Sequence, residues 1–379
     1  MKSILSENKK TFNIKDLKNK LPKKFIKFSK LTPEKKRKVV ALDIGSSMTK
    51  IVEGTYYKKN LSIDNYIKLP TPKGAIIDGE IKKIDELVLK IGEKLKSNGI
   101  NAKHGICTNN STLIINREFK IPKVEDDEIE TVVRYEIQQY LPINLEDYIL
   151  QVKVLNEEYT DTEIKLNVRA IAYPDKIAKE YYNLLNKLDL KPYALDVNYN
   201  SVNKLIQFTD VNNRYENKHG DSIAFIDMGA NFIDVNIYRY GNLDFTRMIK
   251  AGGNDINEFF YETEAMDFEE VENLKRERIN LLNDDDSINI LVRQVVDEWI
   301  EKIEKIIQFY KNKSMQNNIE KIFIFGGSSK LNGFEKYMSK KIGIDTRRMK
   351  GISKMTFNST DDCEPVDDYI NAIGSIIRL

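Results

Sequence analysis

The sequence is poor in the residues that build disulfide frameworks, zinc sites and histidine-based catalytic centres. Its 379 residues include two cysteines, two histidines and one tryptophan. Cys107 and Cys363 cannot form a disulfide framework, and no cysteine–histidine cluster has the spacing of a zinc site. No run approaches the roughly 18 apolar residues of a membrane span, and the N-terminus lacks the apolar core of a signal peptide. We therefore expect a soluble, cytoplasmic protein.

Charge is distributed unevenly along the chain. The 60 basic and 58 acidic residues give a formal net charge of +2. Residues 1–38, however, contain 14 basic and three acidic residues, a net charge of +11, which leaves −9 for residues 39–379. This asymmetry predicts a basic arm attached to an acidic body. The length and a hydrophobic content of 41% suffice for two or three domain-sized units.

Strand and helix patterns alternate through the body. The polar segment 210–221 contains no strand pattern and is typical of a hinge between two halves. In the first half we expect strands at 39–42, 51–57, 61–69, 105–107, 112–119, 148–155 and 164–172, with helices at 83–97, 126–141 and 174–188. In the second half we expect strands at 222–227, 232–240, 243–250 and 321–325, with helices at 287–311, 333–342 and 368–377.

A short pattern occurs once in each half. Residues 39–50 read VVALDIGSSMTK, and residues 223–234 read IAFIDMGANFID. Each is an apolar strand that ends in Asp, followed by one residue, a glycine, small or polar residues and a second strand. Asp43 and Asp227 lie 184 residues apart, about the length of one domain. A duplicated strand–turn–strand unit predicts two similar lobes that face a shared cleft.

The two turns have the composition of phosphate-binding hairpins. Gly45, Ser46 and Ser47 allow backbone N–H groups to converge on a phosphate, and Lys50 adds a positive charge. The second turn offers the equivalent residues Gly229, Ala230 and Asn231. A single such turn is more often a plain β-turn, but two in register favour phosphate binding. Asp43 and Asp227 would then hold a magnesium ion, most plausibly through its waters.

Two glycine pairs offer further ligand contacts. Gly326 and Gly327, followed by Ser328, lie between a predicted strand and a helix, where the backbone can approach a flat ligand such as adenosine. Gly252 and Gly253 open a helix and offer another phosphate-side or ribose-side turn. Either pair alone is also compatible with a plain glycine turn.

One helix carries a candidate sugar and base contact. Asp267 and Glu270 have the spacing of a helix cap, and Glu272 and Lys275 then share one face of the helix. Glu272 suits ribose hydroxyls, and Lys275 would lie along adenine. A solvated salt pair remains the alternative interpretation of these two residues.

Together these residues resemble the actin-like ATPase superfamily. Within it, the sequence is most similar to the PilM family of type IV pilus assembly, a relative of the cell-division protein FtsA. The resemblance covers nearly all of residues 39–379. It is carried by the segments LDIGSSMTK at 42–50, LPTPKGAIIDGEI at 69–81, YEIQQYLPINLED at 135–147, RMIKAGGN at 247–254 and ENLK at 272–275.

The resemblance implies an α/β fold that is actin-like, a ribonuclease H-like duplication with two lobes. The first lobe would span residues 39–219 and carry an inserted small α/β subdomain at about 124–194. The second lobe would span residues 220–379, with a terminal helix that returns to the first lobe.

The resemblance also implies a function. We expect an ATP- and Mg²⁺-binding scaffold, peripheral at the inner face of the cell membrane, that contacts platform or motor components of the pilus. A groove beside the insert would receive the cytoplasmic N-terminus of a PilN-like bitopic membrane protein. The candidate residues for that groove are Tyr135, Tyr140, Leu141 and Pro142.

Catalytic residues do not follow from the resemblance. Ile233 stands where the family usually has a threonine, which would remove a hydroxyl near the phosphates and count against hydrolysis. Val271 stands where alanine is typical, a change of packing only. Nothing in the sequence aims an acid such as Glu136 at the cleft, so we expect at most a weak ATPase. An FtsA-like filament protein and, less favoured, a small-molecule kinase of the same superfamily are the alternatives.

The basic arm is longer than the resemblance accounts for. Its apolar residues recur at steps of three and four with lysines between them, and Pro22 interrupts the series. A basic amphipathic segment is suited to an anionic membrane surface. Nucleic-acid binding lacks an accompanying motif, and a solubilising tail remains the simpler interpretation. The apolar residues of the series are Ile14, Leu17, Leu21, Phe25 and Phe28.

Overall fold

The structure is a computed structural model that describes residues 36–160, 163–209, 222–315, 317–349, 355–358 and 366–378. Contacts divide the chain after Lys35, and every feature described below belongs to the unit of residues 36–379. The amphipathic series of the arm, the predicted hinge at 210–221 and Cys363 lie outside the described residues.

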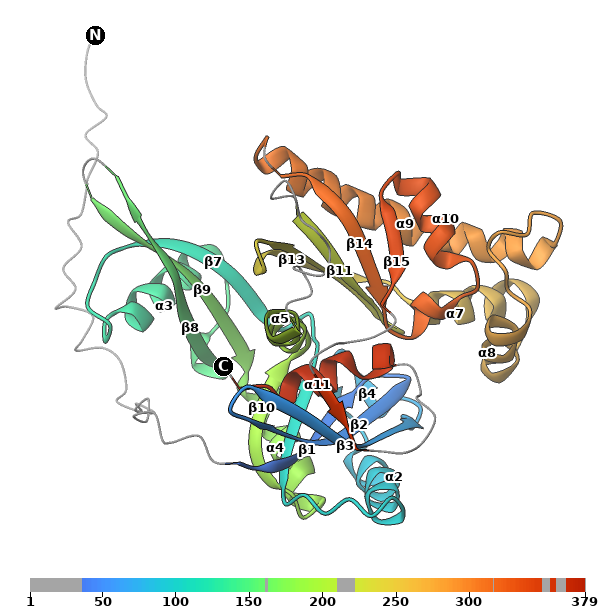
Figure 1. Cartoon of the computed structure of the whole chain (residues 1–379), viewed down its shortest axis with the longest axis horizontal. Helices are drawn as coiled ribbons and strands as arrows, with labels where there is room; N and C mark the ends of the chain where they lie inside the picture. The colour runs from blue at the N-terminus through green and yellow to red at the C-terminus, as the bar shows by residue number, and fades with distance from the viewer. Residues whose placement is uncertain are drawn as a thin grey trace, which may run out of the picture. The chain divides into compact units, whose positions relative to one another are not determined.

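The first half contains a six-stranded mixed sheet with the order β10-β6-β1-β2-β3-β16 (Figure 1). Three strands form antiparallel hairpins, and two more continue the sheet in parallel on the other side of β1. Six of the seven residues of β1 are buried, as expected for a central strand covered on both faces. The strands are β1 (Lys38–Ile44), β2 (Met48–Tyr57), β3 (Asn60–Pro70), β6 (His104–Asn109), β10 (Lys191–Val197) and β16 (Met355–Phe357).

The second half repeats this arrangement. Its sheet has the order β13-β12-β11-β14-β15, with antiparallel hairpins on one side of β11 and parallel strands on the other. The first five strands of the first sheet have the same order and directions, so the predicted duplication is confirmed. The strands are β11 (Ser222–Met228), β12 (Phe232–Arg239), β13 (Asn242–Lys250), β14 (Ile319–Phe325) and β15 (Asp345–Arg348).

Two apolar cores cover the large sheets, and the first also includes residues of the second sheet such as Phe225 and Phe323. Trp299 is fully buried in the second core, where the apolar stripe of the longest helix packs beside the sheet. The helices of the first core come from both ends of residues 36–379, because the last described helix packs against β1, β2 and β6. In the part of the chain that the structure describes, no helix has the length and apolarity needed to cross a membrane. The helices are α2 (Ile84–Ser97), α4 (Asp175–Lys187), α5 (Asn198–Thr209) and α11 (Ile370–Ile376) in the first half, and α7 (Gly253–Glu264), α8 (Phe268–Glu277), α9 (Ser287–Lys313) and α10 (Phe334–Ile342) in the second.

Short elements complete the two halves. A two-stranded hairpin follows β3, and short 3-10 helices follow β14 and precede α11. These elements are β4 (Ile76–Ile77), β5 (Glu80–Ile81), η2 (Gly327–Lys330) and η3 (Val366–Tyr369).

A separate three-stranded sheet forms an insert in the first half (Figure 1). Its order is β7-β9-β8, and α3 packs on it around a third apolar core. The insert therefore spans residues 115–174, which corrects the predicted bounds of 124–194. The next segments, α4 and β10, belong to the core and sheet of the first half. The insert contains β7 (Ile115–Pro122), α3 (Ile129–Tyr140), η1 (Leu145–Asp147), β8 (Tyr148–Tyr159) and β9 (Ile164–Pro174).

Candidate functional site

The turn after β1 is braced from β3 and the residue that follows it. The backbone N–H of Gly45 donates to Met48 O at 3.1 Å, which closes the turn. Thr71 then holds it twice, because its hydroxyl donates to Gly45 O at 2.8 Å and its N–H donates to Ser47 O at 2.9 Å. Ser46 and Ser47 stay half-buried at the tip. The sequence did not point to Thr71, whose hydroxyl is the main side-chain support of this predicted phosphate turn.

The turn after β11 is held by the two glycine segments that the sequence analysis treated separately. The N–H of Gly253 donates to Gly229 O at 3.1 Å, and the hydroxyl of Ser328 donates to the same oxygen at 2.8 Å. The N–H of Asn254 donates to Ala230 O at 2.8 Å. The second predicted phosphate turn, the start of α7 and the start of η2 therefore form one cluster.

Two glycines allow the backbone segments of this cluster to approach one another closely. A Cβ on Gly252 would lie 2.5 Å from Gly229 O, and a Cβ on Gly326 would lie 2.4 Å from Asp227 Oδ1. Gly326 also has a φ of +85°, a region that side chains rarely adopt. A Cβ on Gly327, by contrast, would meet nothing within 4 Å, so its surroundings are open.

The predicted sugar and base contact joins the same cluster. The ammonium of Lys275 donates to Gly253 O at 3.1 Å and forms an ion pair with Glu272. Burial lowers the pKa of Lys275, although Glu272 opposes that change. Asp267 and Glu270 make the reciprocal capping bonds that the sequence predicted at the start of α8. Asn257, which the sequence analysis missed, donates to Glu272 Oε1 at 3.0 Å.

The two aspartates at the ends of β1 and β11 are within electrostatic reach of each other and of one lysine. Asp43 is 3% exposed and Asp227 is 8% exposed. The Nζ of Lys50 lies 3.2 Å from Asp43 Oδ2. Burial disfavours the ammonium of Lys50, but the charges of Asp43 and Asp227 outweigh it and raise its pKa. Burial raises the pKa of Asp227 to about 6 despite a hydrogen bond from Asn371 Nδ2 at 2.8 Å.

Asp234 is a further buried carboxyl in this cluster. It pairs with Asp227 across the β11–β12 ladder, and Asn110 of the first half donates to it. Burial and the charge of Asp227 raise the pKa of Asp234 to about 8. Alternating polar residues in an otherwise apolar strand, Asp234 and Asn236, were the sequence signal for this position.

An ion-paired aspartate links three distant segments near the same place. Asp368 in η3 pairs with Lys68 of β3 at 2.9 Å and with Lys330 of η2 at 2.7 Å. Burial opposes ionisation of Asp368, but the two lysines outweigh it and lower its pKa. The charge of Asp368 also contributes to the raised pKa of Lys50. These pairs fix η2, and with it Ser328, relative to the first sheet.

Asp43 and Asp227 suit a magnesium ion that keeps most of its waters. Within the described residues no group of three or more His, Cys, Asp or Glu side chains has the geometry of a metal site. Two carboxylates instead form the sparse donor set that Mg²⁺ uses together with phosphate oxygens. Burial raises the pKa of Asp227, and a cation beside it would favour its ionised form. The residues present therefore fit the ion.

The remaining predicted residues lie elsewhere. Ile233 is fully buried in the second apolar core, so the absence of a threonine there changes core packing and removes no group from the exposed turn. Tyr135 and Glu136 lie on α3 of the insert. Tyr140 ends α3 and is 62% exposed, Leu141 packs against the core of the insert, and Pro142 is exposed.

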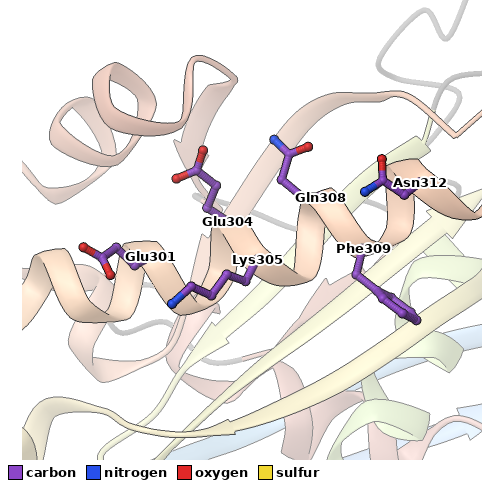
Figure 2. Close-up of a pocket in the computed structure, with 6 residues that line it drawn as sticks. All are labelled: Glu301, Glu304, Lys305, Gln308, Phe309 and Asn312. Carbon is purple, nitrogen blue, oxygen red and sulfur yellow. The ribbon is translucent and has the colours of Figure 1, made fainter.

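A shallow depression on α9 is separate from the cluster (Figure 2). All of its lining residues come from this single helix, and none is a predicted site residue. They are Glu301, Glu304, Lys305, Gln308, Phe309 and Asn312. The candidate site is the cluster around the second turn together with Asp43 and Lys50 beside the first.

Comparisons with known proteins bear on the family and the fold of the chain. The family model described as type IV pilus assembly protein PilM matches residues 41–370. A solved structure described as a PilM-PilN type IV pilus biogenesis complex is 20% identical, covers 89% of this chain and 97% of that chain, and has a TM-score of 0.76. The ethanolamine utilization protein EutJ from Carboxydothermus hydrogenoformans is 12% identical, covers 91% and 90% of the two chains, and has a TM-score of 0.53. These two structures share the fold.

Proposed function

The chain belongs to the PilM family of type IV pilus assembly proteins, and on that premise we propose that it is an ATP-binding, actin-like scaffold of the inner-membrane assembly platform. One observation carries the proposal: the second phosphate-type turn, the two glycine segments and the Glu272–Lys275 pair form one hydrogen-bonded cluster. Asp43 and Lys50, beside the first turn, are within electrostatic reach of Asp227 in that cluster. These segments are spread over more than 280 residues of sequence.

Each part of the cluster has a role in this proposal. The turns at Gly45–Ser47 and Gly229–Asn231 would bind the phosphates, and Lys50 would neutralise part of their charge. Asp43 and Asp227 would hold Mg²⁺, which supplies charge neutralisation at the phosphates. The open backbone at Gly327 and the pair Glu272 and Lys275 would receive ribose and adenine.

We propose that the partner is the cytoplasmic N-terminus of a PilN-like bitopic membrane protein. The solved relative described as a PilM-PilN complex supports this choice. The exposed Tyr140 and Pro142 at the end of α3 are candidates for the contact surface, together with Tyr135 and the partly buried Leu141. Such a partner would place the chain at the inner face of the membrane, alongside other pilus components.

Arg169 connects the insert, which carries this candidate surface, to the second half. It lies on β9 of the insert with 12% of its side chain exposed, and it donates to Leu243 O of β13 at 3.0 Å. Arg169 also pairs with Glu118 of β7. A nucleotide that stabilises the closed arrangement of the halves would therefore also restrain the insert. In this scheme ATP alters partner affinity as a clamp and needs no rapid hydrolysis.

The test is a titration of the full chain with a peptide of the PilN-like N-terminus, with and without Mg²⁺ and ATP. We expect nucleotide to change the peptide Kd by about fivefold or more, within the usual range of coupling between sites. Tyr140→Ala should weaken binding in both conditions. Arg169→Ala should reduce the effect of nucleotide.

Tyr240→Ala is the matched control, because Tyr240 is an exposed tyrosine in the turn between β12 and β13. It should leave peptide affinity unchanged. Absence of peptide binding, or equal losses in the Tyr140 and Tyr240 variants, would count against the proposed partner surface.

A further inference from the structure

Asn254, in the first turn of α7, is fixed by the second phosphate-type turn. Its N–H donates to Ala230 O at 2.8 Å, and its Nδ2 donates to Asn231 Oδ1 at 2.6 Å. Backbone and side chain are thus both attached to the same turn. Any change in that turn would be transmitted directly to Asn254.

Asn257 lies one helical turn further along α7 and is 2% exposed. Its Nδ2 donates to Asn254 Oδ1 at 3.1 Å and to Glu272 Oε1 at 3.0 Å. Both of its amide hydrogens therefore have acceptors, one toward the turn and one toward α8. Its Oδ1 has no hydrogen-bond partner among the described residues. A buried amide with this geometry fixes the distance between the two groups that it joins.

Glu272 is held through only one of its oxygens. Oε1 accepts from Asn257 and also contacts the ammonium of Lys275. Among the described residues no hydrogen bond to Oε2 is found, and 34% of the Glu272 side chain is exposed. A carboxylate fixed at one oxygen and open at the other is suited to accept a hydrogen bond from a sugar hydroxyl.

We propose that Asn254 and Asn257 are positioning residues that join the phosphate turn at Gly229–Asn231 to Glu272, so that the site selects a ribonucleotide over its deoxy analogues. This inference rests on the proposed nucleotide-binding function. A deoxy analogue presents a C–H group where ATP presents a sugar hydroxyl. The free oxygen of Glu272 then has no donor on the sugar, and the complex loses one hydrogen bond. Selection for the hydroxyl depends on the position of Oε2, which Asn257 fixes.

The experiment measures the affinity of the full chain for ATP, 2′-deoxy-ATP, 3′-deoxy-ATP and inorganic tripolyphosphate, each with Mg²⁺. The variants are Asn257→Ala and the isosteric Asn257→Asp, which places a like charge against Glu272 and creates no cavity. The control is Asn289→Ala, because Asn289 is also buried in the second half but binds the N–H of Asn280, outside the cluster.

We expect the wild type to prefer ATP over at least one deoxy analogue by about tenfold or more, the effect of one hydrogen bond to a charged acceptor. Both Asn257 variants should bring this ratio close to one and leave the affinity for tripolyphosphate within about twofold. Asn289→Ala should retain the wild-type ratio.

The contradicting results distinguish a failure of the positioning role from a failure of nucleotide binding. If the wild type binds ATP without preference, if the Asn257 variants keep the ratio, or if they weaken tripolyphosphate as much as ATP, the positioning role is wrong while ATP binding stands. If the wild type binds none of the four ligands, the proposed nucleotide-binding function itself fails.

Discussion

Asp234 has a pKa that is raised further than that of its neighbour Asp227. Its pKa is raised to about 8 by burial and by the charge of Asp227, against about 3.9 for an unfolded aspartate. The folded state therefore holds a proton that the unfolded state releases above pH 4. The stability from this group is fully present below about pH 4 and is lost as the pH rises toward 8.

Asp234→Asn should remove this dependence, since an amide does not titrate and can still accept from Asn110. Relative to the wild type, the variant should gain free energy of unfolding as the pH rises from 4 to 8, by about 2 kcal/mol or more. Denaturant unfolding of the nucleotide-free protein at pH 5 and pH 8 measures this difference. Asp285→Asn in an exposed loop is the control, and identical pH slopes for wild type and Asp234→Asn would contradict the assignment.

At the residue level, the sequence identifies site residues that belong to a local motif. It does not identify residues that contact the site from a distant segment of the chain. Asp43 and Asp227 were predictable because the same short pattern surrounds both. Thr71 and Asn371 were not, because each reaches its partner from a different segment of the chain. A single threonine or asparagine in the sequence does not indicate which distant turn or carboxylate its side chain will hydrogen-bond.

The junction of β14 and η2 gives a prediction at the level of elements, because its two glycines have different surroundings. An alanine Cβ at position 326 would lie 2.4 Å from Asp227 Oδ1, at a φ of +85°. Gly326→Ala should therefore lower the free energy of unfolding by roughly 1–3 kcal/mol and also disturb Asp227. Thermal unfolding and ATP titration measure the two effects.

Gly327→Ala is its matched partner. A Cβ there meets nothing within 4 Å, so the folded protein should keep its stability. The same Cβ would occupy the open side proposed for the nucleotide, and ATP affinity should fall. Equal stability losses in the two variants would contradict the description of this junction.

Element prediction succeeds where pairing is local. The hairpins β1–β2 and β11–β12 and the cap of α8 were evident, because their turn and cap residues adjoin the segments that they join. The strand β10 and the bounds of the insert were not. β10 pairs with β6, some 87 residues earlier, and β7 pairs with β9 across the whole insert. Such pairing leaves no pattern in a short window of sequence.

For the whole molecule, the basic arm yields a prediction that is independent of the nucleotide site. Residues 1–38 carry a net charge of +11, of which residues 1–35 carry +8, and each lysine or arginine near an anionic surface contributes about 1 kcal/mol. The full chain should co-sediment with anionic vesicles, less so at high salt, whereas residues 36–379 should not. This boundary keeps Lys38, which pairs with Asp64 at 2.9 Å and Glu53 at 3.4 Å. Neutral vesicles are the control, and equal co-sedimentation of both chains would contradict membrane attachment.

The duplicated architecture was predictable for the whole molecule, since the repeated motif implied two sheets of one topology and the structure has them. The insert's link to the second half through Arg169 was not, because it depends on where β9 lies relative to β13. The arm, despite its clear charge pattern, has no partner that the sequence alone identifies.

The most direct test of the account is ATP binding by the wild type, Asp43→Asn and Asp227→Asn in the presence of Mg²⁺, with thermal unfolding to verify that the variants fold. Asp285→Asn serves as the control. The account predicts that the Asp43 and Asp227 variants each lose about tenfold or more in affinity, roughly 1.4 kcal/mol, while the control binds as the wild type does. Equal affinity in the wild type and in both of these variants would contradict the assignment of the nucleotide to this cluster.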